Sequence, residues 1–439
     1  MDKPFFSTRK RLVFAIVSVF ILIFALAACQ DTTDTSTEDG DDVVQTQELG
    51  DYGPFGDAPN PSDFEWDVIT YEGWKDVYPY HYESYVSNLD NKPASQGGDK
   101  HNYLTDYPFL MTLYKGHAFT KGYWQAAGHP WAIKDMEGSP RIGETTLQNC
   151  YGCKSPQYIS LIIKDPAAAA VPFVDSENFT EPVACWSCHG NDPESNSVGS
   201  PWWNDALGSD KGKTPASAEV CGQCHNEYYF DPDTRIVTNP YLGGLKSMTP
   251  QDLIEYYDNI GFRDWVYPVT ETPMIKLQHP EFEMIYGGAT PMRMARENNY
   301  ACADCHMGPT TASDGTAFTS HFWQSPLKNA DLLANDCGQS GCHSDLAKEV
   351  AGWQDQVVKR FTATGYDLEE MVNLFVAKVE AGEIAGDDLD RMRVIQRHAQ
   401  IYWDFVFVEN SNGAHNRAYA LAYLDEADKL IKEGMGILG

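Results

Sequence analysis

Ten of the eleven cysteines in the sequence stand in five close pairs whose spacing suits covalent haem attachment. Three pairs lie in C-x-x-C-H strings, in which two thiols bond the vinyl groups of a haem and the adjacent histidine binds its iron. The pairs are Cys150/Cys153, Cys185/Cys188, Cys221/Cys224, Cys302/Cys305 and Cys337/Cys342. Because this part of the chain has no odd cysteine, the pattern predicts five c-type haems rather than disulfides or zinc sites.

Four pairs are followed directly by a histidine that can bind iron on the attachment side. These histidines are His189, His225, His306 and His343. The last pair, Cys337 and Cys342, has four intervening residues instead of two, a loop that can still reach both vinyl groups. A disulfide between these two cysteines is the alternative, but it leaves the adjacent histidine unexplained.

The first pair differs, because Cys150-Tyr-Gly-Cys153 is followed by Lys154. A deprotonated lysine gives iron a primary amine in place of an imidazole, which changes the electronics of the opposite face. A substituted ligand is typical of a haem with a special task. The alternative is that Lys154 points to solvent and the iron takes a histidine from elsewhere in the chain.

A count of ligands shows that one iron can stay open for a substrate. Five irons offer ten axial positions, of which the lysine and the four histidines above fill five. If the four histidine-ligated haems are six-coordinate, they need only four further groups, and the lysine haem remains open. The remaining histidines are His81, His101, His117, His129, His279, His321, His398 and His415.

The N-terminus predicts export and anchoring. Residues 1–28 combine basic residues with an apolar run that ends in Leu-Ala-Ala before Cys29, the pattern of a bacterial lipoprotein signal peptide. Acylation of Cys29 would anchor the protein at the extracytoplasmic face of the cell membrane. The alternative is an uncleaved transmembrane anchor. Residues 29–51 hold eight acids and no Lys or Arg, which predicts a flexible acidic tether.

Beyond the tether, two regions of different composition follow. Residues 52–345 are rich in Gly, Pro, Trp and Tyr and hold every cysteine pair, as expected of a loop-rich core that packs around haems. Residues 346–439 lack proline and place Ala420, Leu424, Ala427 and Ile431 at helical steps. We therefore expect a mainly α multihaem cytochrome c that ends in three or four long helices.

The charge balance excludes one class of partner. Lys and Arg number 32 against 63 Asp and Glu, a formal net charge of −31. Nucleic-acid phosphates would repel such a chain, so we expect no nucleic-acid partner.

Five strings, in order, resemble the pentahaem cytochrome c nitrite reductases, the ammonia-forming enzymes. They are CYGCK (150–154), CGQCHNEYYF (221–230), TPMIKLQHPEFE (272–283), CADCHMG (302–308) and ENSNGAHN (409–416). The resemblance covers about residues 60–435. It implies an active site at the lysine haem, with Arg141, Tyr228 and His279 around the open face of Lys154's iron.

The resemblance also implies a calcium ion and three distal haem ligands. The calcium ligands fall on Glu227, Tyr228, Lys276 and Gln278. The distal histidines carry over as His129 for the third haem, His321 for the second and His415 for the fourth, counting haems by their attachment motifs. His398 is expected to cap or pack within the C-terminal helices rather than bind iron.

The fifth haem departs from the family pattern. Where the family has its distal histidine, this chain reads Pro-Met-Arg-Met-Ala-Arg (291–296). Met294 or Met292 can replace the histidine, and a thioether ligand would raise the potential of that haem. The alternatives are a five-coordinate iron or a more distant histidine, such as His81, His101 or His117.

The expected activity is the six-electron reduction of nitrite to ammonium, fed by four further haems. Two alternatives remain: a multihaem electron conduit, which the lysine motif disfavours, and a reductase acting mainly on hydroxylamine or a sulfur oxyanion. The resemblance implies a membrane-bound, quinol-oxidising cytochrome c as electron donor and a homodimer formed through the C-terminal helices.

Overall fold

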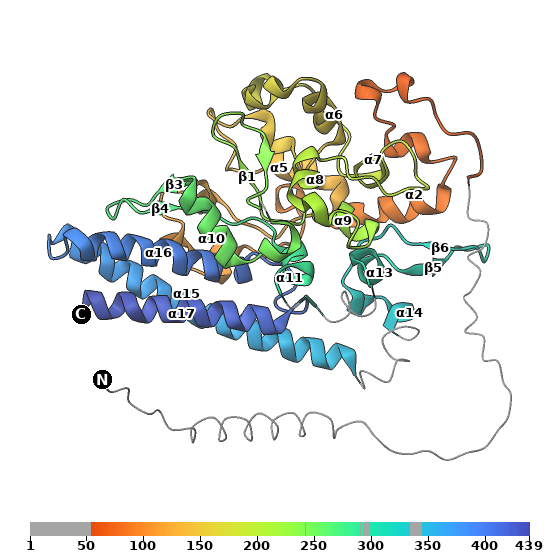
Figure 1. Ribbon diagram of the computed structural model, residues 1–439. Helices are drawn as coiled ribbons and strands as arrows, with labels where there is room; N and C mark the ends of the chain where they lie inside the picture. Colours follow the sequence, from red (N-terminus) through yellow and green to blue (C-terminus); the bar gives the residue numbers. More distant parts are fainter. Residues whose placement is uncertain (1–53, 242, 290, 293–298, 334–344) are drawn as a thin grey trace, which may run out of the picture. The chain divides into compact units, whose positions relative to one another are not determined.

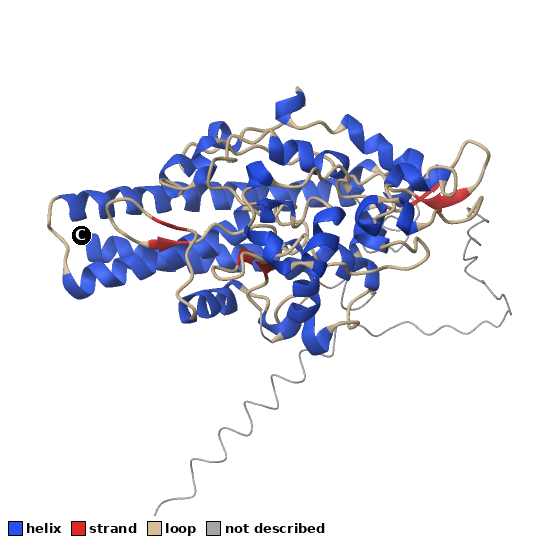
Figure 2. Cartoon of the chain, turned by 90° about the horizontal axis from the view of Figure 1, so that it is seen from above, coloured by secondary structure: helices blue, strands red, loops and turns tan. Residues whose placement is uncertain are grey.

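The computed structural model describes residues 54–241, 243–289, 291–292, 299–333 and 345–439 (Figure 1). The predicted signal peptide, Cys29 and the acidic tether lie outside the described residues. The same holds for four residues assigned to the fifth haem, which are Cys337, Cys342, His343 and Met294. Helices and long loops make up most of the described chain, with a few short strands (Figure 2). This confirms the prediction of a mainly α, loop-rich fold.

The first described region, up to residue 333, consists of short helices separated by loops. Proline occupies the first turn of several of them, where its missing N–H costs nothing. Frequent glycine and proline prevent longer helices here. The helices are α2 (Pro79–Val86), α3 (Tyr103–Asp106), α4 (Leu110–Leu113), α5 (Ala132–Glu137), α6 (Pro156–Lys164), α7 (Cys185–His189), α8 (Pro201–Leu207), α9 (Ala216–Gly222), α10 (Pro250–Asn259), α11 (Glu281–Tyr286), α13 (Cys302–His306) and α14 (Ala330–Leu332).

Three small antiparallel hairpins interrupt these helices. They are β1 (Tyr229–Phe230) with β2 (Val237–Thr238), β3 (Trp265–Val266) with β4 (Pro273–Met274), and β5 (Pro309–Thr311) with β6 (Ala317–Thr319). The first hairpin begins directly after Tyr228, and the second precedes the segment 275–281. Two of the hairpins therefore fix the backbone next to predicted site residues.

Three long helices end the chain, as the sequence predicts: α15 (Leu346–Glu380), α16 (Gly386–Phe407) and α17 (Arg417–Leu438). They pack side by side (Figure 1). The predicted apolar stripe of α17 is buried at all four of its positions. Within the described residues, no helix is long and apolar enough to cross a bilayer.

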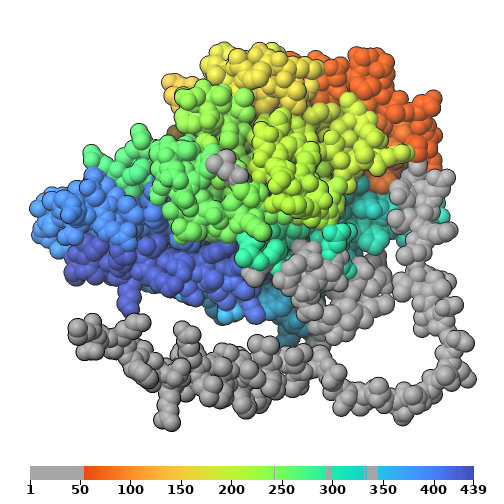
Figure 3. Space-filling model, viewed as in Figure 1, coloured from red at the N-terminus to blue at the C-terminus, as the bar shows by residue number. Residues whose placement is uncertain are grey.

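Helix α16 is the core element of this bundle. Residues 399–407 are buried without interruption, because α15 and α17 cover one side and α10 and β4 cover another. In the space-filling view the C-terminal helices, in blue, lie directly against the part of the chain coloured green, which includes α10 (Figure 3). Gly365 allows a close approach of α15, since a Cβ there would lie 2.7 Å from the ring of Phe109.

Candidate active site

The haem motifs fold into short helical turns that gather their reactive side chains on one face. In both α7 and α13 the two cysteines are three residues apart and the histidine follows one residue later. On a helix, residues at i, i+3 and i+4 share a face. The residues concerned are Cys185, Cys188 and His189 in α7, and Cys302, Cys305 and His306 in α13.

The cysteines of the four described motifs form no disulfide with one another, in keeping with thioether attachment. They are Cys150, Cys153, Cys185, Cys188, Cys221, Cys224, Cys302 and Cys305. Their attachment to haem stays a prediction from the sequence.

Cys305 is assigned by the sequence to the second thioether of the fourth haem. In the structure it is a partly exposed cysteine without a disulfide, one helical turn after Cys302 in α13. Burial raises the pKa of the neighbouring Tyr286, and the charges of Cys302 and Cys305 raise it further. The place of Cys305 suits haem attachment, but the structure does not test the bond itself, so the thioether stays a prediction.

The third motif uses a glycine for close packing. It begins at the end of α9, and a Cβ on Gly222 would lie 2.6 Å from both Phe282 and Trp203. Only glycine fits this contact. The motif therefore lies tightly against α11, the helix that follows His279.

The spacing of histidine rings tests whether haem fits between them. Two imidazoles on one iron, with bonds of about 2.0 Å and ring centres about 1.1 Å behind the bonded nitrogens, have centres roughly 6.2 Å apart. The ring centres of His189 and His321 lie 6.2 Å apart, and those of His306 and His415 lie 6.0 Å apart. Both pairs fit the ligation predicted for the second and fourth haems.

His225, the proximal histidine of the third haem, has two neighbours at this spacing. Its ring centre lies 6.2 Å from His129 and also 6.2 Å from His279. Distance alone therefore fits either histidine. The family resemblance assigns His129 to the iron and His279 to the substrate side. The Nδ1 atoms of both are buried and meet no hydrogen-bond partner in the described chain.

Cysteine contacts give the order of the haem sites. The thiol of Cys153 lies in hydrogen-bonding contact with Cys224, and the thiol of Cys221 with Cys302. The attachment site of the first haem thus adjoins that of the third, which adjoins that of the fourth. Cys188, from the second motif, lies close enough to both cysteines of the third motif to interact with them electrostatically. The four described sites form one connected relay.

The structure brings the four predicted catalytic side chains close to the first haem site. Lys154 follows the 3-10 turn Gln148–Tyr151 and interacts electrostatically with His279. Arg141 interacts with Tyr228 and with Cys150. Tyr228 in turn interacts with both cysteines of this motif. Residues from four separate segments therefore meet at one place.

Arg141 is held in a fixed orientation. Its Nε donates a hydrogen bond of 2.9 Å to Ser139 Oγ, and its guanidinium carbon lies 4.3 Å from the ring centre of Phe119. Burial lowers the pKa of Arg141, while the neighbouring Tyr123 and Asp135 raise it. A guanidinium stays cationic at neutral pH, so this group can bind an anion.

Tyr228 and His279 are both uncharged at neutral pH. Burial raises the pKa of Tyr228 well above its usual range and lowers the pKa of His279 to about 4. The phenol therefore keeps its proton, and the imidazole keeps a single N–H. Each can donate a hydrogen bond to a small anion.

The predicted calcium ligands are adjacent in space. Glu227 Oε2 accepts a hydrogen bond of 2.6 Å from Gln278 N, and Gln278 Nε2 lies 2.9 Å from Lys276 O. Burial raises the pKa of Glu227 and raises that of nearby Glu283 to about 8. Two buried carboxylates in one place fit a divalent cation, which would stabilise their charged forms.

This set is not a cluster of acids, because the backbone and an amide supply most of its oxygens. In the described part of the chain, no group of three or more His, Cys, Asp or Glu side chains could hold a metal ion. Lys276 offers only its carbonyl oxygen. Its ammonium donates to Leu277 O at 2.7 Å and lies 3.4 Å from Asp404 Oδ2.

Three carboxylates beside these residues were not anticipated from the sequence. Asp404 contacts Lys276, while Glu281 and Glu409 face the haem-ligand histidines His225 and His415. Glu281 and Glu409 lie inside two of the motifs quoted above. The sequence signal for these two acids is their spacing: Glu281 lies two residues after His279, and Glu409 lies six residues before His415.

The other histidines fall in different places. The ring centre of His81 lies 5.0 Å from that of His321, and the ring centre of His117 lies 4.6 Å from that of Trp265, with the two planes tilted by 39°. His101 Nδ1 lies 3.2 Å from Asp106. Because the fifth haem motif is outside the described residues, its distal ligand stays a prediction. His398 packs against α10, where its Nε2 lies 2.7 Å from Asp258.

Comparison with known proteins supports this arrangement. The family model "Cytochrome c552" matches residues 70–437. The cytochrome c-552 of Aliarcobacter butzleri is 31% identical over 380 residues, which cover 78% of this chain and 71% of the relative. The cytochrome c nitrite reductase subunit NrfA of Nitratidesulfovibrio vulgaris is 29% identical over 421 residues, which cover 84% and 78%.

A solved structure shares the fold. The cytochrome c nitrite reductase of Desulfovibrio desulfuricans, described with two calcium sites, superposes with a TM-score of 0.71 at 24% identity, covering 84% of this chain and 86% of that one. The family match spans the haem motifs, the gathered side chains and the C-terminal helices. The chain therefore belongs to the cytochrome c552 family, the pentahaem cytochrome c nitrite reductases, as its motifs predict.

Proposed function

We propose that this protein is an ammonia-forming nitrite reductase that works at the lysine-ligated first haem. The observation that carries the proposal is the meeting of Arg141, Tyr228 and His279 beside the CYGCK motif. A motif with lysine in the ligand position alone would suit other tasks. A cation and two neutral hydrogen-bond donors beside it suit a small oxyanion.

The reaction takes up six electrons and eight protons for each nitrite and releases ammonium and two waters. When bound, the haems supply the iron that holds the substrate and the electrons that reduce it. The chain supplies binding and protons. Arg141 attracts the anion into a buried site, where an unscreened charge acts strongly.

His279 and Tyr228 serve as hydrogen-bond donors to the nitrite oxygens. Because His279 is neutral, it acts as an N–H hydrogen-bond donor and not as a cationic imidazolium. Tyr228 is held between Glu227 and the hairpin β1–β2. Calcium bound by Glu227, Lys276, Gln278 and the carbonyl of Tyr228 would fix the position of the phenol.

A spectroscopic titration tests the proposal. Nitrite added to the oxidised holoprotein should shift the signal of one high-spin haem, because one iron has an open position. Bis-ligation at every iron would instead indicate an electron conduit. Steady-state rates with nitrite, hydroxylamine and sulfite then decide among reductases, and the proposal predicts the highest kcat/KM for nitrite.

The location and partners of the protein form a further part of the proposal. Residues 1–28 would direct export, acylated Cys29 would anchor the chain at the outer face of the membrane, and residues 29–51 would be a flexible tether. A membrane-bound, quinol-oxidising cytochrome c would donate the electrons. The C-terminal helices would form a homodimer, which sedimentation analysis of the holoprotein can test.

A further inference from the structure

The six histidines that pair at haem sites differ in what their second ring nitrogen meets. Three meet a backbone carbonyl, one meets no partner in the described residues, and two face a carboxylate. The Nδ1 contacts are His189 with Ser195 O at 2.8 Å, His306 with Gln324 O at 3.0 Å, His321 with Thr319 O at 3.0 Å, His415 with Glu409 Oε1 at 2.5 Å, and His225 with Glu281 Oε2 at 3.7 Å.

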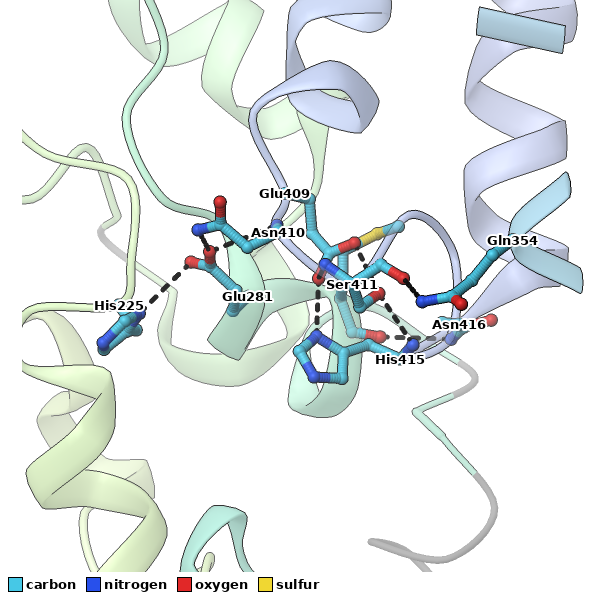
Figure 4. A network of polar contacts seen from close by, with 9 residues as sticks. His225, Glu281, Gln354, Glu409, Asn410, Ser411, His415 and Asn416 are labelled. Atoms are coloured by element: carbon cyan, nitrogen blue, oxygen red, sulfur yellow. Dashed lines mark hydrogen bonds and ion pairs between the residues drawn. The ribbon is translucent and has the colours of Figure 1, made fainter. Parts of the chain in front are cut away.

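Both carboxylates are buried and are held in place by one loop. Glu409 is 1% exposed and Glu281 is 7% exposed. Ser411 Oγ donates to Glu409 Oε2 at 2.7 Å, and Asn410 donates to Glu281 through its side-chain amide. Figure 4 shows Glu281 directed toward His225 and Glu409 directed toward His415, with Asn410 and Ser411 beside the two acids.

The loop is itself fixed on the helices around it. Gln354, from α15, donates to Ser411 O at 2.9 Å, and Asn416 donates to Met284 O of α11 at 3.2 Å (Figure 4). His415 N donates to Ser411 Oγ at 2.9 Å. The positions of the two acids are thus built into the fold and do not depend on exposed side chains.

A carboxylate and a carbonyl act differently on a ligand histidine. Both accept a hydrogen bond from Nδ1–H and fix the tautomer of the ring. The carboxylate also adds a negative charge, which makes the imidazole a stronger donor and stabilises the ferric state of the iron. Because these acids are buried, solvent ions screen that charge weakly.

We propose that Glu409 and Glu281 are positioning residues that lower the midpoint potentials of the fourth and third haems, Glu409 more strongly because it lies closer to its histidine. In the order given by the cysteine contacts, the third haem site adjoins that of the lysine haem, and the fourth adjoins the third. An electron on either haem would be a stronger reductant than an electron on a haem whose ligand histidine donates to a backbone carbonyl. The inference rests on the ligation by His225 and His415 and goes beyond the choice of substrate.

The test is a spectroelectrochemical titration of the full-length holoprotein without nitrite, with low-spin haems counted by electron paramagnetic resonance. Glu409→Gln keeps the shape and an acceptor oxygen but removes the charge. It should raise the midpoint potential of one haem by about 59 mV, which corresponds to a roughly tenfold change in the equilibrium constant of a one-electron reduction. Glu281→Gln should raise the potential of a different haem by less.

Two further variants separate charge from structure. Ser411→Ala removes the hydroxyl that shares the negative charge of Glu409, so the same haem should shift in the opposite, negative direction. Glu433→Gln is the control, because it removes a carboxylate charge of α17 from an exposed ion pair with Arg391 of α16. This control should leave every midpoint potential unchanged.

Several results would overturn the proposal. Unchanged potentials in both glutamine variants, with all low-spin haems retained, would show that the charge has no effect. A new high-spin haem in both variants would show that the acids only hold the histidines in place. A shift in Glu433→Gln as large as in Glu409→Gln would indicate a general charge effect. Because no nitrite is present, none of these results bears on nitrite turnover.

Discussion

The buried ion pair between Lys276 and Asp404 should make a large contribution to stability. Lys276 is 2% exposed, and its Nζ lies 3.4 Å from Asp404 Oδ2. Asp404 also accepts hydrogen bonds from Tyr114 OH and, at 3.0 Å, from Leu277 N. Burial lowers the pKa of Lys276 and raises that of Asp404, so each charge depends on the other.

Asp404→Asn keeps the shape of the side chain but leaves the lysine ammonium buried without its counter-ion. Breaking a buried pair in this way costs about 3–5 kcal/mol. Unfolding entropy of about 2.1 cal/mol/K per residue, over the roughly 390 residues of Leu49–Gly439, gives about 0.8 kcal/mol/K. We therefore expect the Tm of the holoprotein to fall by roughly 4–6 °C.

A double-mutant cycle isolates the pair. Lys276→Met leaves Asp404 unpaired and should cost a similar amount, whereas the double variant removes both charges and should cost much less than the sum. Thermal unfolding followed by far-UV circular dichroism measures all four proteins. Glu433→Gln, at an exposed ion pair, is the matched control and should change Tm by no more than about 1 °C. Additive effects in the cycle would refute the reasoning.

Four further predictions concern the haems, the calcium and the anchor. Lys154→His should keep all five haems, since the attachment thiols stay, but should lower nitrite turnover by roughly tenfold or more; an unchanged rate would contradict lysine as the active-site ligand. Chelation of calcium should lower activity, because Tyr228 loses its support, and added Ca²⁺ should restore it; full activity in a protein shown to be calcium-free would exclude this role. Cys29→Ala should release the protein from the membrane fraction, and membrane retention of both forms with the signal cleaved would show that lipid at this cysteine is not the anchor. Met294→Ala or Met292→Ala should abolish a charge-transfer band near the red edge of the visible spectrum; if neither variant alters the spectrum and the oxidised protein shows only one high-spin haem, with all others bis-histidine, the ligand of the fifth haem is a histidine from elsewhere in the chain.

Local sequence patterns predicted much of the fold and of the chemistry of the site. The thiols and the proximal ligands of each haem lie within five to seven residues of one another, so spacing alone predicts their task. The stripe of α17 is equally local, because its four apolar residues recur at helical steps. Features of this kind need no knowledge of the rest of the fold.

Contacts between distant segments could not be obtained in this way. Lys276 and Asp404 are 128 residues apart, and the sequence does not indicate that the lysine ammonium pairs with a carboxylate of α16. The pairing of His129 with His225 came from the family resemblance, since nothing in their spacing joins them. The roles of Glu281 and Glu409 depend on how the loop after α16 docks, which only tertiary structure defines.

The helix α16 links these long-range contacts, because it lies along the segment that carries the active-site residues. The contacts follow one another in the same order along the two segments. Gln396 Oε1 accepts from Thr272 Oγ1 at 2.5 Å, and Arg397 donates to Pro273 O at 2.8 Å. Further along, Asp404 accepts from Leu277 N at 3.0 Å. Asn410 then reaches Glu281. The segment and the helix run in the same direction, so the helix fixes the register of the KLQH string. The C-terminal region thus positions His279 and the calcium ligands of its own chain, a task separate from any contact with a second subunit.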